Sequence, residues 1–344
     1  MMLRAPKFRL AVVALLGGAL AFYILKSTGI KSILLAAAAV GWRGFATLCV
    51  YQLPLFVVLG TAWYVLIPAS YRSRASVFIW ARMVRDATSD LLPFSHLGGI
   101  VLGARTAMSR GVLQRVAIGS MVTDVTTEML AQIAFTAVGV VVLITATPHN
   151  SPPYSIASTA AFGFTTIVLS CAAFVAFQRY GRTLTTKLIS RLFPSAASAT
   201  ESVAICIEEI YRRPANVGLS VLFHCGGWVA SALSTWIALF FMGVQARVWP
   251  VVAIESLVCA VRSMAFLVPN GLGVQEVAYA AIAPLFGIGP EIGLAVSVLK
   301  RARDIAVGLP ILLLWQWSES SGFLVNGSVA ARRAKQRRPQ AHWE

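Results

Sequence analysis

Long apolar runs, separated by short polar and basic stretches, make up most of the chain. The runs long enough to cross a bilayer cover about residues 8–25, 45–68, 116–146, 157–178, 216–242 and 290–317. A membrane helix needs roughly 20 mostly apolar residues, because the hydrocarbon core of a bilayer is about 30 Å thick. The pattern therefore predicts about six full membrane spans.

Two further apolar stretches, 84–110 and 250–287, are interrupted near their middles. The interrupting residues are Pro93, Gly98 and Gly99 in the first stretch, and Pro269, Asn270, Gly271 and Gly273 in the second. Proline removes a backbone donor and glycine permits turns, so we expect the helix to break there. Lipid offers such backbone no hydrogen bonds, so each break must lie inside protein or beside a watery cavity. We predict two re-entrant hairpins, with eight ordinary but kinked spans as the alternative.

The composition agrees with a membrane location, since 58% of the residues are hydrophobic and only 12% are charged. We predict an all-α polytopic membrane protein with a single transmembrane domain, residues 1–320, and a basic cytoplasmic tail, residues 321–344. Interrupted segments in corresponding positions of the two halves indicate an inverted repeat with a site near the membrane midplane. Residues 179–215 mix apolar and charged side chains, which predicts an amphipathic helix on the membrane surface.

The net charge of +16 arises mainly from basic residues beside the apolar runs. If the N-terminus is cytoplasmic, most of the 29 Lys and Arg residues, Arg82 and Arg85 among them, fall on cytoplasmic flanks. This satisfies the positive-inside rule and places both termini in the cytoplasm, although Lys26, Lys31 and Arg43 lie in the first outer loop. Membrane orientation and anionic lipid then account for the basic charge, so we expect no nucleic-acid partner.

The five cysteines are scattered and form no C-x-x-C motif, which argues against a disulfide framework or a zinc site. We expect no metal and no cofactor. The chain contains no H-E-x-x-H, Walker A or nucleophile-elbow motif, so we expect no enzyme. Asp86 and Asp90 leave one enzymatic alternative open, in which the carboxylates hold Mg²⁺ and a diphosphate for headgroup transfer.

Charged residues inside the apolar segments are the strongest functional candidates, because each costs several kcal/mol unless it is paired or hydrated. They are Asp124, Glu128, Glu255, Arg262, Glu276, Lys300, Arg301, Arg303 and Asp304. The last four lie near the middle of the final span, where three cations accompany one acid. We expect an anion to neutralise the positive excess, either a lipid headgroup or protein carboxylates. The charge-balancing carboxylates are predicted to be Asp124, Glu128, Glu255 and Glu276.

Salt bridges that only lock the helices together are the alternative role for these charges. Glu255 and Arg262 lie seven residues apart on one helix face, so they are candidates for such a pair. Lys300 and Arg301 have helical pair spacings to Asp304. His224, beside Cys225, is interpreted as a polar packing residue.

The hairpins offer a second device that attracts anions. A helix that restarts after Gly98-Gly99, or after Gly271-Leu272-Gly273, directs free N–H groups and a positive dipole end toward the midplane. Internal capping by Ser95, Gln275 or Glu276 is the alternative. His96 either binds a headgroup or relays a proton, or it bonds to neighbouring backbone. The predicted substrate-binding residues are Arg262, Glu276, Lys300, Arg301, Arg303, Asp304, Asn270, Gly271, Gly273, Gln275, Pro93, His96, Gly98 and Gly99.

Three sequence blocks resemble the family of the membrane half of lysylphosphatidylglycerol synthase, whose members are also called flippase-like proteins. The blocks are Leu92-Pro93-Phe94 with Gly98-Gly99 and Gly103-Ala104-Arg105; Pro269-Asn270-Gly271-Leu272-Gly273-Val274-Gln275-Glu276; and Leu299-Lys300-Arg301-Ala302-Arg303-Asp304. The resemblance covers about residues 8 to 318, and the last two blocks look most like the hopanoid-biosynthesis-associated membrane protein of bacteria.

The resemblance implies a protein of the bacterial inner membrane whose suspected activity is lipid translocation. Lysyl transfer in the full synthase belongs to a separate soluble domain, which this sequence does not contain, so we do not expect lipid lysylation. We hypothesise a transporter or flippase-like protein whose partners are membrane lipids with polar or anionic headgroups, hopanoids included, and lipid-synthesis enzymes. A headgroup-transferring enzyme and a non-catalytic scaffold for lipid-synthesis enzymes are the alternatives.

Overall fold

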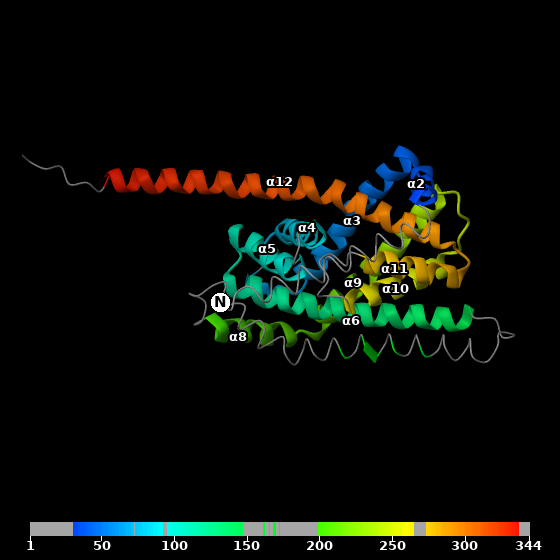
Figure 1. The fold of residues 1–344 in the computed structure, drawn as a ribbon. Helices are drawn as coiled ribbons and strands as arrows, with labels where there is room; N and C mark the ends of the chain where they lie inside the picture. The colour runs from blue at the N-terminus through cyan, green and yellow to red at the C-terminus, as the bar shows by residue number, and fades with distance from the viewer. Residues whose placement is uncertain are drawn as a thin grey trace, which may run out of the picture.

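A computed structural model describes residues 30–71, 73–91, 95–146, 199–264 and 273–336, together with a few positions between 161 and 172. Within these residues the chain is helical and contains no β-strand, which confirms the predicted all-α class. Figure 1 shows long helices that lie roughly side by side, with shorter helices packed between them.

Long apolar helices form the frame of the molecule. The helices long and apolar enough to cross a membrane are α3 (Gly41–Tyr64), α6 (Gln114–Ala146) and α9 (Pro214–Phe241). Their bounds agree to within a few residues with the predicted spans 45–68, 116–146 and 216–242. The predicted span 8–25, and nearly all of 157–178, lie outside the described residues.

Both predicted interruptions divide an apolar stretch into separate helices. The first stretch contains α4 (Ala75–Leu91) and α5 (Ser95–Ser109), which pack against each other. The second contains α10 (Val248–Met264), α11 (Val274–Ile282) and the short 3-10 helix η4 (Ala283–Phe286), and α11 packs on α10. That each pair of helices returns to the membrane face from which it enters stays a prediction.

The glycines of the first hairpin do not mark a helix restart, contrary to the sequence-based expectation. α5 begins at Ser95, and Gly98 and Gly99 lie inside it. A Cβ atom at Gly99 would overlap Ser89 Oγ and the carbonyl oxygen of Arg85 on α4. Gly99 therefore permits the close approach of α4 and α5, because a larger residue would force the two backbones apart.

The last helix is longer than predicted. α12 (Pro290–Gln336) starts where the span 290–317 was expected to start, but it continues to Gln336, and Figure 1 shows it projecting past the other helices. The predicted tail is therefore helical from residue 321 to residue 336. Its Ala, Arg, Lys and Gln residues are good helix formers, so the polar sequence after residue 321 does not end the helix.

Short helices precede α3 and α9. α2 (Ile30–Ala39) joins α3 through Gly41, whose φ of 62° lies in the left-handed region. α8 (Ala199–Tyr211) falls in the segment predicted to be amphipathic, and its buried face packs on α6. That face consists of Val203, Cys206 and Ile210.

The contacts between helices repeat when the halves α2–α6 and α8–α12 are exchanged. α3 packs on α9, while α4 packs on α12 as α10 packs on α6, and α2 packs on α12 as α8 packs on α6. In Figure 1, α6 runs from left to right, whereas α12 begins at the right and runs to the left. This arrangement supports the predicted inverted repeat and places each hairpin against the long helix of the opposite half.

Candidate functional site

A polar face of α12 points toward α10 and α11. Ser297, Lys300, Arg301 and Asp304 fall at helical spacings of three and four residues, so they share one side of α12. Lys300 forms an ion pair with Glu255 of α10, and Nζ also donates to the hydroxyl oxygen of Tyr279, 3.1 Å away on α11. Lys300, Glu255 and Tyr279 therefore link α12, α10 and α11.

The carboxylate of Glu255 is saturated with donors. Besides Lys300, it accepts hydrogen bonds from the hydroxyls of Tyr279 at 2.6 Å, Thr235 at 2.8 Å and Ser231 at 3.0 Å. Glu255 is only 2% exposed. A buried charge is tolerated when it is paired and its remaining lone pairs are bonded, and Glu255 meets both conditions.

Glu276 caps the start of α11 and also binds a cation. Its carboxylate accepts the backbone N–H of Gly273 at 2.9 Å and forms an ion pair with Arg301 of α12. Gln275 beside it donates from Nε2 to Ser297 Oγ at 2.9 Å. Of the alternatives left by the sequence, internal capping is therefore the one observed at α11, and the carboxylate of Glu276 occupies the place an external anion would take.

Arg303 is held differently from the pattern that helical spacing predicts. Its guanidinium lies 2.6 Å from Asp304 Oδ1 and donates to Ser234 Oγ of α9 at 3.1 Å. Neither Lys300 nor Arg301 forms a described ion pair with Asp304, because both have carboxylate partners on α10 and α11.

Arg262 lies where the two interrupted stretches meet. The predicted pair with Glu255 is not formed, since Glu255 binds Lys300. Among the described residues, no carboxylate lies within ion-pair distance of Arg262, although Asp90 at the end of α4 and Asp304 of α12 are close enough to act on it electrostatically. Arg262 lies in the last turn of α10, and Asp90 is the last residue but one of α4.

We call the set Glu255, Arg262, Glu276, Lys300, Arg301, Arg303 and Asp304 the second-half polar cluster. A separate set, the first-half ion cluster, consists of Arg82, Arg85 and Asp86 of α4 with Asp124 and Glu128 of α6. Arg85 lies 2.7 Å from Asp124 and 2.6 Å from Glu128, and Arg82 lies 2.6 Å from Glu128 and 2.8 Å from Asp86. This network ties the first hairpin to the long helix α6.

The first-half ion cluster corrects one sequence-based expectation. Asp124 and Glu128 were predicted to balance the cations of the last span, but their partners are Arg82 and Arg85. Both arginines are buried, 3% and 8% exposed, and their position on a cytoplasmic flank stays a prediction. The signal that the sequence did contain is the matched spacing: basic residues three apart on α4 face acidic residues four apart on α6.

The remaining predicted site residues are distributed as follows. Gly273 has φ 80° and starts α11, which only glycine does without strain. Gly98 and Gly99 lie inside α5, and the backbone of His96 is part of that helix. Pro93, Asn270 and Gly271 lie outside the described residues.

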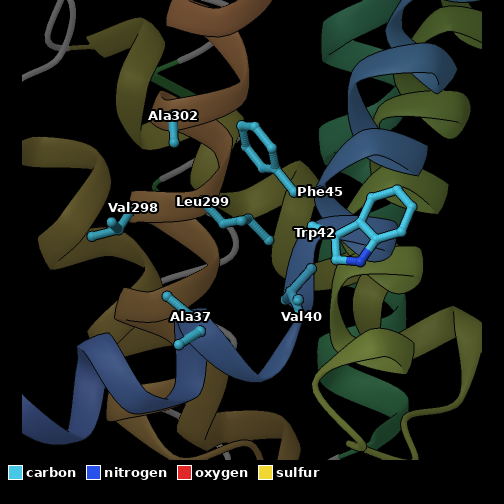
Figure 2. A pocket seen from close by; sticks show the side chains of 9 residues that line it. Ala37, Val40, Trp42, Phe45, Val298, Leu299 and Ala302 are labelled. Carbon is cyan, nitrogen blue, oxygen red and sulfur yellow. The ribbon is translucent and has the colours of Figure 1, made fainter.

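An apolar groove of about 410 Å³ lies on a different face of α12 (Figure 2). It is lined by Ala37, Ala38, Val40, Gly41, Trp42, Phe45, Val298, Leu299 and Ala302. Ligand pockets in proteins have volumes of this order. Its lining suits a hydrocarbon chain rather than a polar group. Over residues 297–304, α12 therefore has a polar face toward α10 and α11 and an apolar face along this groove.

Charges on α4, α6, α10, α11 and the middle of α12 nearly cancel. Apart from the exposed Arg115 at the start of α6, the cations are Arg82, Arg85, Arg262, Lys300, Arg301 and Arg303, and the carboxylates are Asp86, Asp90, Asp124, Glu128, Glu255, Glu276 and Asp304. Of the two neutralising groups expected for the positive excess of the last span, a headgroup or protein carboxylates, the structure shows carboxylates of α10 and α11 bound to Lys300 and Arg301.

Apolar spanning helices, interrupted hairpins and interior ion pairs define a polytopic helical membrane protein. A scan against protein families matches residues 8–311 to the lysylphosphatidylglycerol synthase transmembrane region. The chain belongs to this family, which indicates a membrane protein involved in lipid handling. Comparisons with curated proteins and with solved structures find no match.

Proposed function

We propose that the protein moves a polar-headed membrane lipid from one leaflet to the other. The observation that carries this proposal is the second-half polar cluster, which holds buried charges and joins α9, α10, α11 and α12. Buried charges are expensive in a membrane, and they usually line the path of a polar substrate. Membership of a lipid-handling family supports the same activity.

In this proposal the headgroup passes the cluster by exchanging partners with it. Arg301 holds Glu276, and a phosphate or carboxylate of a headgroup offers the same bidentate acceptor. Arg262 has no carboxylate at ion-pair distance among the described residues, so it accepts an anionic group without first losing one. The lipid chains stay in the bilayer or in the apolar groove beside Leu299.

We place the protein in the bacterial inner membrane with both termini cytoplasmic, because that orientation satisfies the positive-inside rule. The cargo is a phospholipid or a hopanoid with an extended polar head. We propose no catalysis. Asp86, one of the two carboxylates considered for a Mg²⁺ site, bonds Arg82 at 2.8 Å, so metal binding there requires that ion pair to break.

Leaflet exchange in liposomes tests the proposal. Purified protein is reconstituted with tail-labelled fluorescent phospholipids, and a membrane-impermeant reductant bleaches the label exposed at the outer surface. We expect the wild type to bring inner-leaflet label to the outside, and Arg301→Ala to slow this exchange about tenfold, which equals about 1.4 kcal/mol in the barrier. Size-exclusion elution confirms that the variant is folded.

Arg212→Ala is the matched control, because it removes an arginine from an exposed ion pair, 2.8 Å from Glu208 on α8. Its exchange rate should equal that of the wild type. Equal exchange by Arg301→Ala and wild type would remove the cluster from the pathway. No exchange by the wild type with any labelled lipid, phospholipid or hopanoid, would favour the scaffold alternative.

A further inference from the structure

A buried histidine extends the first-half ion cluster to α9. His224 is completely buried, and its Nε2 lies 3.0 Å from Asp124 Oδ1. Its other ring nitrogen, Nδ1, is buried and has no hydrogen-bond partner among the described residues. Leaving a buried polar atom unpaired is costly, so the environment of Nδ1 calls for an explanation beyond packing.

The sign of the unmatched charge distinguishes this site from the second-half polar cluster. In the second-half polar cluster, Lys300 faces Glu255, Arg301 faces Glu276, and Arg303 faces Asp304, with Arg262 as a fourth cation. In the first-half ion cluster, three carboxylates share two arginines. The carboxylates are Asp86, Asp124 and Glu128, and the arginines are Arg82 and Arg85.

One of the three carboxylate charges has no matching arginine, and His224 contacts one of these carboxylates, Asp124. A protonated imidazole supplies one positive charge and makes the cluster neutral, which the low-dielectric interior favours. We propose that His224 and Asp124 form a proton-binding site: a proton from water bonds to the imidazole, and Asp124 accepts the Nε2–H hydrogen bond of the resulting cation.

The surroundings of His224 leave the imidazole as the group that accepts this proton. From α6 it faces Asp124 and Glu128, and from α4 the arginines bound to them. The other helices packed on α9 bring their titratable groups to it about two turns or more from His224. These contacts are Tyr51 of α3 to Ala230, Glu255 of α10 to Ser231, and Arg303 of α12 to Ser234. At the end of α8, Glu208 pairs with Arg212, before α9 begins.

Protonation of His224 thereby changes the strength of the contact between α9 and α6. The protonated histidine makes a charge-assisted bond to Asp124, which is stronger than the bond of a neutral imidazole. Because α9 also packs on α10 and α12, a proton bound here biases the packing around the second-half polar cluster. In transport, which rests on the function proposed above, the proton serves as the ion that couples to lipid movement.

Imidazole ¹⁵N NMR of the purified full-length protein in micelles measures the proton directly. The chain has only four histidines, and His224→Gln identifies the signals of His224 by their disappearance. We expect these signals to show the cationic pattern in acidic buffer, because the proposed site holds a proton on the imidazole. Asp124→Asn makes the cluster neutral without a proton, so its His224 signals should stay neutral throughout.

A second readout is leaflet exchange as a function of pH. In the wild type the rate should change about fivefold or more between acidic and alkaline buffer, as coupled sites typically do, and in His224→Gln the ratio should fall to about one. Neutral His224 signals at every pH in the wild type would overturn the proposal. The NMR result decides the proton site even if the protein exchanges no lipid, so the two proposals fail separately.

Discussion

Replacing Lys300 with methionine removes the cation that faces Glu255 and keeps a similar side-chain volume. The remaining carboxylate is 2% exposed, and the hydroxyls of Tyr279, Thr235 and Ser231 still donate to it. Breaking a buried ion pair from one side typically costs about 3–5 kcal/mol. Because three hydrogen bonds remain, we expect the lower end, about 3 kcal/mol.

The double variant Lys300→Met with Glu255→Gln removes both charges. The glutamine Oε1 can accept the hydrogen bonds of Tyr279 and Thr235, and its Nε2 can donate to Ser231 Oγ, so no unpaired charge is left and we expect a loss below about 1.5 kcal/mol. The single variant should therefore be less stable than the double variant. The two variants differ only in whether a carboxylate or an amide stands at position 255.

Unfolding in mixed micelles with increasing dodecyl sulfate, followed by circular dichroism, measures these free energies. A double-mutant cycle with Glu255→Gln alone gives the coupling between the two charges, which we expect at about 2–3 kcal/mol. A loss below about 1 kcal/mol for Lys300→Met, or equal losses for the single and double variants, would refute the argument that an interior ion pair holds these helices.

Further predictions concern the same unfolding assay unless stated otherwise. Arg85→Met leaves Asp124 and Glu128 with one arginine and should cost about 3–5 kcal/mol, whereas a loss similar to that of a surface substitution would contradict the buried network. Gly60→Ala places a methyl group against the backbone of Ile79 and should cost about 1–3 kcal/mol. Gly218→Ala, on α9 with open space around it, should be neutral or stabilising by up to about 1 kcal/mol. Glu276→Gln weakens the cap on Gly273, so the first turn of α11 should exchange its amide hydrogens faster by mass spectrometry; unchanged exchange would argue against the cap.

The positions of the long helices could be predicted from the sequence. Apolar runs of the required length fix α3, α6 and α9 to within a few residues, because only a helix satisfies its own backbone in lipid. The interruptions after Leu91 and after Met264 were predictable for the same reason: proline and glycine stand there in otherwise apolar stretches.

Partner choice among the charges could not be predicted, because it depends on which helix faces which. Asp124 pairs with Arg85, 39 residues away, and Glu255 pairs with Lys300, 45 residues away. Spacing along one helix instead suggested Arg262 for Glu255. The role of Gly99 was equally hidden, since a glycine near a break and a glycine at a helix crossing look alike in sequence.

The central claim is that a lipid headgroup passes between the two hairpins beside the polar face of α12. Photo-cross-linking with a phospholipid that carries the reactive group on its head, followed by peptide mass spectrometry, tests this most directly. The account predicts adducts on the start of α11 and on residues 297–304 of α12, lost in competition with unlabelled lipid. Adducts confined to outward-facing positions such as Leu309 and Leu313, which are 50% and 61% exposed, would contradict it.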